Sequence, residues 1–284
     1  CAKRRMTTQT LLFRHCFIAI PKLVWKGLLQ EKYKNFWLKQ GFPEWQLGTV
    51  GAIARDTETD DYAFAAASAT TIDSPTHTCG GSDRLLFGGW WGEGTRSSSG
   101  YGPGPASMTN IDSQAADGSF NVNLDYLINP ETTAGVVIGA TFAASATNRA
   151  IFAMSYTGCR QSGVADATSK ATGTSNTITS STTTVANNCF IIAILRDSSG
   201  QTTNTARANT NIFTTLDDDA NGFNGADTSA AITPAGAASI GWDRASGTAT
   251  WGGVWASFAP ALATATALRS PSGGVAYYGG AAYY

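Results

Sequence analysis

An oxygen-rich run near the end of the chain has the residue types and spacing of a metal site. Asp217, Asp219 and Asn221 alternate and are followed by Gly222. Side-chain oxygens at alternate positions converge on one point where a glycine permits a sharp turn, and calcium prefers such ligands. Thr228 stands where such loops carry a glutamate that supplies two oxygens. The run predicts either a calcium site, with calcium as the sole candidate cofactor, or a plain solvated turn.

Three aromatic residues form a candidate glycan site. Trp90 and Trp91 end an apolar run, and Tyr101 lies in the Gly/Ser/Pro-rich segment 93–105, which is predicted to be a loop. Aromatic rings offer an apolar face together with a polar handle, which suits contact with sugar rings. If these rings lie in loops at one end of the fold, the protein is a carbohydrate-binding module.

Enzymatic motifs are scarce in this sequence. Four acidic residues could supply the carboxylate pair of a glycosidase: Glu93, Asp112, Asp117 and Asp125. The two histidines, His15 and His77, lie far apart, and no GxSxG, phosphate-binding or dinucleotide-binding motif is present. Because no cysteine, histidine or carboxylate cluster lies near His77 in the sequence, we expect it in a surface loop. We predict a non-enzymatic protein without catalytic residues.

The five cysteines do not form a metal-binding pattern, since no CxxC pair or Cys/His cluster occurs. Cys79, Cys159 and Cys189 fall in or near predicted strands. They are either buried thiols or include one disulfide, and the thiol alternative is favoured.

The elements that must position these residues are β-strands. Gly, Ala, Ser and Thr dominate after position 50, and apolar runs alternate with turn signals. The predicted strands are 64–72, 84–91, 120–128, 135–142, 150–156, 189–195, 202–215, 237–242 and 248–258. The tract 164–184 is either a long loop or two edge strands. This spacing, without interleaved helices, predicts an all-β fold: an antiparallel, jelly-roll-like β-sandwich.

Three of these strands carry more specific predictions. The run 248–258 is apolar on both faces, so we expect a central strand that closes the sandwich and pairs with 237–242 through a turn at 243–247. The run 120–128 alternates, which predicts one buried face and one wet face. The run 189–195 is continuously apolar and predicts a buried strand.

The two ends of the chain differ in character from the middle. Nine basic and two acidic residues precede position 49, and ten basic and eighteen acidic residues follow, so the charges are +7 and −8. This change predicts four parts: a basic, partly helical arm over 1–48, a linker over 49–64, the sandwich over 65–262 and a Gly/Tyr-rich tail over 263–284. The arm fits a docking segment, a helix packed on its own domain or a membrane-surface helix, and a secretory signal fits less well. The predicted subunit contacts are Trp25, Leu28, Leu29, Phe36, Trp37, Tyr277, Tyr278, Tyr283 and Tyr284.

Several short stretches resemble a known family. The stretches are Ser82-Asp83-Arg84-Leu85-Leu86-Phe87, Asp125-Tyr126-Leu127-Ile128-Asn129-Pro130, Ser155-Tyr156-Thr157-Gly158-Cys159-Arg160-Gln161 and Trp251 to Pro260. In this order they resemble the jelly-roll β-sandwich module of bacteriophage head-fibre, decoration and tail proteins and of bacterial surface proteins. The resemblance covers about residues 65–262 and leaves out the first 48. It implies display and attachment, with no catalytic residues.

These observations lead us to expect a structural protein at a virion or extracellular surface. Its partners would be copies of itself and other virion or surface-assembly proteins. The alternative is a carbohydrate-binding β-sandwich module or adhesin with a cell-surface glycan as partner. We expect no sequence-specific nucleic-acid contact. We also expect no membrane contact, and no apolar run reaches the roughly 18 residues that a membrane span needs.

Overall fold

The computed structural model describes residues 51–56, 61–102, 106–132, 137–198, 204–213, 222–244 and 249–262. This part of the chain is all-β, contains no helix, and pairs its strands antiparallel. It belongs to a compact unit that runs from Val50 to Leu262. The predicted arm over 1–48 and the predicted tail over 263–284 lie outside the described residues.

Four sheets make up the body. The first inner sheet consists of β1 (Ala54–Arg55), β2 (Asp61–Ala65), β4 (Leu85–Glu93), β7 (Thr109–Asp117), β8 (Phe120–Ile128) and β10 (Arg149–Thr157). The first outer sheet consists of β3 (Ala69–Asp73), β5 (Arg96–Gly102), β6 (Ala106–Ser107) and β9 (Val137–Ala146). The second inner sheet consists of β11 (Ala167–Gly173), β13 (Phe190–Asp197), β15 (Thr210–Ile212), β16 (Phe223–Thr228) and β18 (Trp251–Phe258). The second outer sheet consists of β12 (Thr177–Thr183), β14 (Asn204–Ala206) and β17 (Ala237–Arg244).

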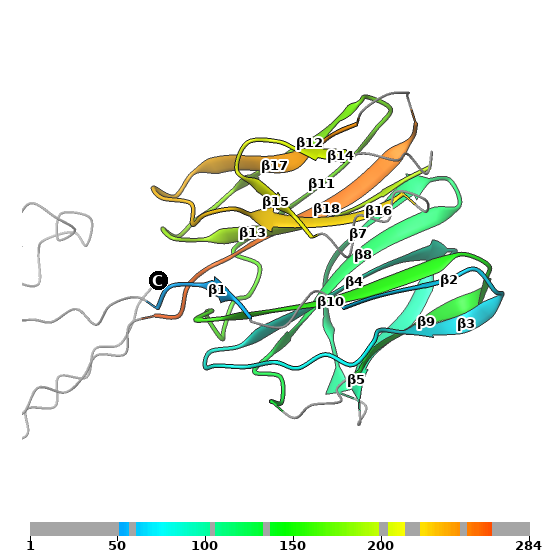
Figure 1. The fold of residues 1–284 in the computed structure, drawn as a ribbon, viewed down its shortest axis with the longest axis horizontal. Helices are drawn as coiled ribbons and strands as arrows, with labels where there is room; N and C mark the ends of the chain where they lie inside the picture. The colour runs from blue at the N-terminus through cyan, green and yellow to red at the C-terminus, as the bar shows by residue number, and fades with distance from the viewer. Residues whose placement is uncertain are drawn as a thin grey trace, which may run out of the picture. The chain divides into compact units, whose positions relative to one another are not determined.

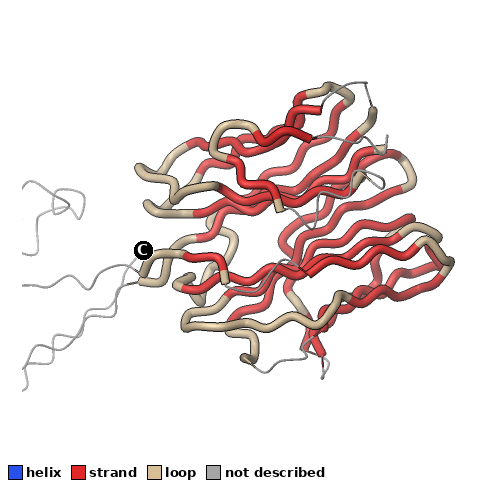
Figure 2. The backbone as a smooth tube through the Cα atoms, viewed as in Figure 1, coloured by secondary structure: helices blue, strands red, loops and turns tan. Residues whose placement is uncertain are grey.

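Three hydrophobic cores bind the sheets into four layers, in the order first outer, first inner, second inner and second outer (Figures 1 and 2). One core, with Trp90 and Ile151, lies between the first outer and first inner sheets. The shared core, with Phe152 and Phe223, lies between the two inner sheets. The third, with Trp242, fills the space between the second inner and second outer sheets. Both inner sheets are therefore covered on both faces.

The two halves of the body, residues 54–157 and 167–258, repeat one topology. The first inner sheet has the order β2-β10-β4-β8-β7, and the second has the order β11-β18-β13-β16-β15. The outer sheets correspond as β3-β9-β5 and β12-β17-β14. Each strand of the second half thus has a counterpart in the first at the same place in the sheet. β1 and β6 are extra: β1 pairs with β10 beyond the end of β2, and β6 pairs with β5.

Strand β4 explains why runs that are apolar on both faces occur in this sequence. Leu85, Phe87 and Trp91 enter the shared core, whereas Leu86 and Trp90 enter the core on the other side. Successive side chains of a strand point to opposite faces, so a covered inner strand needs apolar residues at every position.

Several expectations are confirmed. The buried strand predicted at 189–195 is β13, with Ile192 and Ile194 fully buried. The run 248–258 contains β18, which lies between β11 and β13 with every residue buried. The tract 164–184 forms two edge strands, β11 and β12.

Other expectations were wrong. β17 does not pair with β18, because the chain crosses between sheets: β17 pairs with β12 and β14, and the two strands meet face to face through a hydrogen bond from Trp255 Nε1 to the Ile240 carbonyl. The polar face of β8 is not wet, since the first outer sheet covers it. The predicted linker 49–64 holds β1 and most of β2, and the predicted strand 64–72 is split between β2 and β3. The predicted loop 93–105 holds β5.

Candidate functional site

The predicted glycan site is not assembled in this structure. Trp90 and Trp91 lie in β4 and are 0% and 1% exposed. Their rings instead stack with cations inside the body: the Arg96 guanidinium lies 4.7 Å from the centre of Trp90, and that of Arg196 lies 5.1 Å from Trp91. Tyr101 lies in β5, opposite Ile138. Two of the three aromatics are therefore core residues, which the sequence could not distinguish from loop aromatics.

Of the four acidic residues, the three whose side chains are described have separate partners. Glu93 accepts hydrogen bonds from the Thr147 amide and from Asn148. Asp112 pairs with Lys170 at 2.8 Å. Asp125 is fully buried among hydrogen-bond donors, and the side chain of Asp117 is not among those described.

The calcium candidates Asp217, Asp219 and Asn221 lie outside the described residues, so the calcium site stays a prediction. Within the described ranges, no three His, Cys, Asp or Glu side chains are grouped as metal ligands. The predicted subunit-contact residues also lie outside them.

His77 was expected in a surface loop, and this was wrong. It is 1% exposed, and its Nδ1 lies 2.6 Å from Asp61 Oδ2. Its Nε2 lies 3.0 Å from Ser155 Oγ, which donates to Asp56 Oδ2 at 2.9 Å. Sequence reading missed this cluster because Asp61 and Ser155 are brought to His77 by the pairing of β2 with β10.

The cluster resembles a serine–histidine–aspartate arrangement, but the serine proton is directed to a second aspartate. A nucleophilic serine gives its proton to the histidine. Here the Ser155 hydroxyl directs its proton to Asp56 Oδ2 and not to Nε2 of His77, whose Nδ1 faces Asp61. The hydroxyl is also fully buried. The arrangement therefore joins β2, β10 and the residue that follows β1, and it does not activate the hydroxyl.

A second polar cluster surrounds Asp125, on β8. Its carboxylate accepts hydrogen bonds from Arg96 and from Ser99 at 2.6 Å, both on β5. Asn110, its direct cross-strand partner on β7, donates at 2.7 Å. This cluster joins the first outer sheet to the first inner sheet.

A third cluster surrounds Asp227, on β16, which is 2% exposed. Arg55 Nη2 and Nε donate to its two oxygens at 2.7 and 3.2 Å, and Tyr156 Oη donates at 2.8 Å. Asn211, its direct cross-strand partner, donates at 3.0 Å. Burial raises the pKa of Asp227, while Arg55 acts against that rise. Burial and the nearby Asp227 carboxylate hold the pKa of Tyr156 well above its ordinary value. This cluster joins the two halves.

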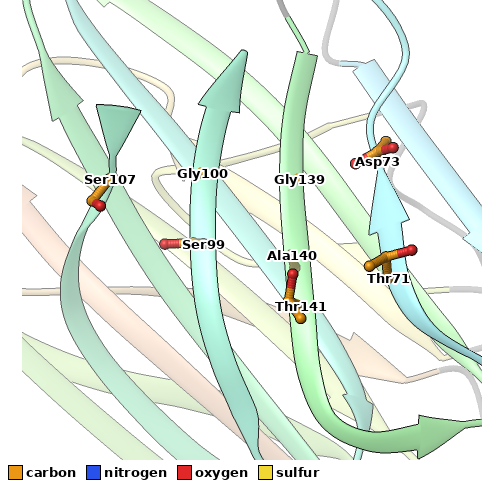
Figure 3. A pocket seen from close by; sticks show the side chains of 8 residues that line it. All are labelled: Thr71, Asp73, Ser99, Gly100, Ser107, Gly139, Ala140 and Thr141. Atoms are coloured by element: carbon orange, nitrogen blue, oxygen red, sulfur yellow. The ribbon is translucent and has the colours of Figure 1, made fainter. Parts of the chain in front are cut away.

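A shallow hollow of about 320 Å³ lies on the first outer sheet (Figure 3). Gly100 and Gly139 face each other across β5 and β9, and a methyl group on Gly139 would lie 2.7 Å from Asp73 Oδ1. The hollow is lined by Thr71, Asp73, Ser99, Gly100, Ser107, Gly139, Ala140 and Thr141. Hydroxyl groups and one exposed carboxylate beside bare backbone suit a hydroxylated ligand.

The first and last described residues meet at one turn. The Ala261 amide donates to the Gly158 carbonyl at 2.7 Å. Gly158 has φ of +68°, and a methyl group there would lie 2.3 Å from the Ala52 carbonyl oxygen. A methyl group on Gly51 would lie 3.9 Å from the Ala261 side chain. Figure 1 shows β1 and the last described residues at the same end of the body.

The buried-thiol alternative is confirmed for the three cysteines in the described residues. Cys79, Cys159 and Cys189 are buried and form no disulfide with one another. Burial, supported by the Asp166 carboxylate, raises the pKa of Cys189 to about 12, and burial also raises that of Cys159. Such thiols are not activated nucleophiles.

Comparison of the sequence with protein-family models and with curated proteins found no match. Among the residues that the structure describes, no helix is long and apolar enough to cross a membrane.

Proposed function

We propose that this is a non-enzymatic structural protein of a virion or another extracellular assembly, built from repeated copies through its terminal segments. The observation that carries the proposal is the common exit of both ends of the body at the Gly158 turn. Two terminal segments that begin at neighbouring points of the body can reach one neighbouring subunit together. The basic segment before position 49 and the acidic remainder of the chain would attract each other between copies.

Each half is proposed to be a jelly roll. Support comes from the strand order, in which the first strand of each half (β2 or β11) lies beside the last (β10 or β18) in an antiparallel sheet. Two packed sheets of this kind are typical of the jelly-roll class. The resemblance to phage decoration and tail modules, drawn over residues 65–262 as a whole, implies the same class of fold together with display and attachment.

The use of buried charge also supports a structural function. The carboxylates of Asp125 and Asp227 and the hydroxyl of Ser155 each join two or more strands. Each is engaged by donors or acceptors within the body, so these buried groups stabilise the stack of sheets.

Deletion of residues 1–47 tests the proposal. We expect the body to keep its β circular dichroism while the multimer dissociates, measured by sedimentation velocity. Deletion of residues 263–284 is the second variant of the experiment. Full assembly of both truncated proteins would contradict the proposal, and raised salt should weaken assembly of the intact chain.

A second candidate function is glycan binding, now placed at the hollow on the first outer sheet. The observation that favours it is the pair of glycines that leaves Asp73 and the hydroxyls of Thr71 and Thr141 around exposed backbone. A glycan array should show a neutral saccharide whose binding is lost in Asp73→Asn. The control is Ser181→Ala, an exposed position on the second outer sheet. An array without a hit, or equal binding by both variants, would contradict this placement.

A further inference from the structure

We propose that Arg55 and Asp227 form an acid-released latch that holds β1, and with it the root of the N-terminal segment, on the second half of the body. Arg55 lies on β1, which pairs with β10 of the first half. Its guanidinium reaches across the shared core to both oxygens of Asp227. The same guanidinium lies 4.7 Å from the centre of the Phe213 ring, also in the second half.

β1 depends strongly on this contact because it is short. It has two residues, and its register with β10 comprises only Ala54 opposite Thr157 and Arg55 opposite Tyr156. A bidentate arginine–carboxylate contact is a strong, charge-assisted interaction. Arg55 remains 30% exposed, whereas Asp227 is 2% exposed. The cation can therefore move into water, but the carboxylate cannot.

Protonation of Asp227 and attachment of Arg55 oppose each other. Among the described residues, the polar groups that face the carboxylate are Arg55 from β1, Tyr156 from β10 and Asn211 from β15, and Cys159 lies near Tyr156. Burial raises the pKa of Asp227, so this carboxyl takes up a proton at a higher pH than an ordinary aspartate. Arg55 lowers that pKa. By linkage, a proton on Asp227 must weaken the attachment of Arg55 by the same factor.

The body should stay folded when Asp227 is protonated. A carboxyl whose pKa is higher in the folded state than in the unfolded state binds more protons when folded. Its contribution to stability is therefore fully present below the unfolded pKa and is lost as pH rises through the folded pKa. Acid consequently favours the folded body through this group while it loosens β1. A neutral acid can still accept from Tyr156 and Asn211, which keep the two halves joined.

Amide hydrogen exchange measured by mass spectrometry tests the latch on the full chain. The reporter is the Asp56 amide, which donates to the Ser155 carbonyl at 2.9 Å just beyond β1. After correction for intrinsic exchange rates, we expect residues 51–56 to exchange about tenfold faster in mild acid than at neutral pH. Peptides from β18 serve as the internal reference and should stay protected.

Two variants sharpen the test. Asp227→Asn removes the charge and should give fast exchange of 51–56 at every pH, and Arg55→Gln should do the same if Asp227→Asn fails to fold. Asp112→Asn is the matched control, because Asp112 also pairs across the halves, with Lys170, but lies on β7, at the opposite edge of the first inner sheet from β1. It should behave as the unmodified protein does. Exchange of 51–56 that is independent of pH in the unmodified protein, or unchanged in the latch variants, would overturn the proposal.

The latch rests on the proposed function only in assuming that the N-terminal segment acts in assembly. Exchange of 51–56 needs no assembly, so a failed latch leaves the result of the 1–47 deletion standing. Conversely, a chain that never assembles can still show the latch.

Discussion

The two halves of the body share a strand order but use buried charge differently. Each half has an arginine on its outer sheet that bonds an aspartate on its inner sheet: Arg96 with Asp125 in the first, and Arg244 with Asp197 in the second. The second half has an additional buried aspartate, Asp227, that faces the first half. These two arginine–aspartate pairs, on strands that are not counterparts, each hold one half together, whereas Asp227 joins the halves.

A closer comparison shows how one strand pair can serve two purposes. β7 and β15 both contain Thr-Asn-Ile, and in each the asparagine lies directly opposite the buried aspartate of the next strand. Asp125 points to its own outer sheet, whereas Asp227 points to the opposite half. Because side chains alternate along a strand, a difference of one position is enough to move an aspartate to the other face.

The largest expected effect comes from the core that the halves share. Phe223 packs against Tyr62, Trp91 and Phe152 of the first half. Phe223→Ala should lower the free energy of unfolding by about 3–5 kcal/mol. Fluorescence and circular dichroism should report one coincident urea transition. Ile240→Ala, within the second half, is the comparison variant, and two separate transitions in either would mean that the halves are independent.

Neutralising the two aspartates should give unequal results. Asp125→Asn leaves Arg96, whose side chain is 14% exposed, without its charge partner, at a cost of about 3 kcal/mol. Asp227→Asn should cost less than about 1 kcal/mol, since the partly exposed Arg55 can turn to water. Urea denaturation measures the stability lost in each variant. Equal losses would contradict the expected difference between the two aspartates.

Substitution of Gly158 should destabilise the protein more than substitution of a glycine in a comparable turn elsewhere. Gly158→Ala combines a positive φ with a methyl group 2.3 Å from the Ala52 carbonyl, and should cost about 2–3 kcal/mol. Gly118, also at positive φ, has no atom within 4 Å of such a methyl group, so Gly118→Ala isolates the backbone strain at about 1 kcal/mol. Thermal unfolding measures the stability lost in each variant. If Gly118→Ala lost as much stability as Gly158→Ala, residues 51–53 would not be held at this turn.

The smallest effect concerns pH. Because the folded pKa of Asp227 is raised, its contribution to stability should fall as pH rises through that value, by at most about 1.4 kcal/mol per pH unit. This dependence of stability on pH should disappear in Asp227→Asn. It is measured from the urea midpoints of the unmodified protein and the variant at each pH. Identical dependence on pH in the two proteins would contradict the raised pKa of Asp227.

Much of the architecture follows from the sequence alone. The continuous apolar runs at β13 and β18 predict strands covered on both faces, because each side chain there needs an apolar neighbour. Turn signals between short β-branched runs predict antiparallel pairing and the absence of helices in the part described. The repeated Thr-Asn-Ile was a sequence signal for the duplication, but three residues are too few to establish it without the strand order.

Only the tertiary structure decides which face of a strand is covered and by what. From the sequence, Trp90 and Trp91 fit loop aromatics and core residues equally well. The structure decides, because the first outer sheet and the second half cover the two faces of β4. Asp125 belongs to an alternating pattern that is typical of a wet face, yet Arg96 and Ser99 arrive from another sheet and replace water. The contact between Arg55 and Asp227 joins residues 172 positions apart. Local propensity specifies strands, whereas such contacts depend on how the layers stack, which no short stretch of sequence encodes.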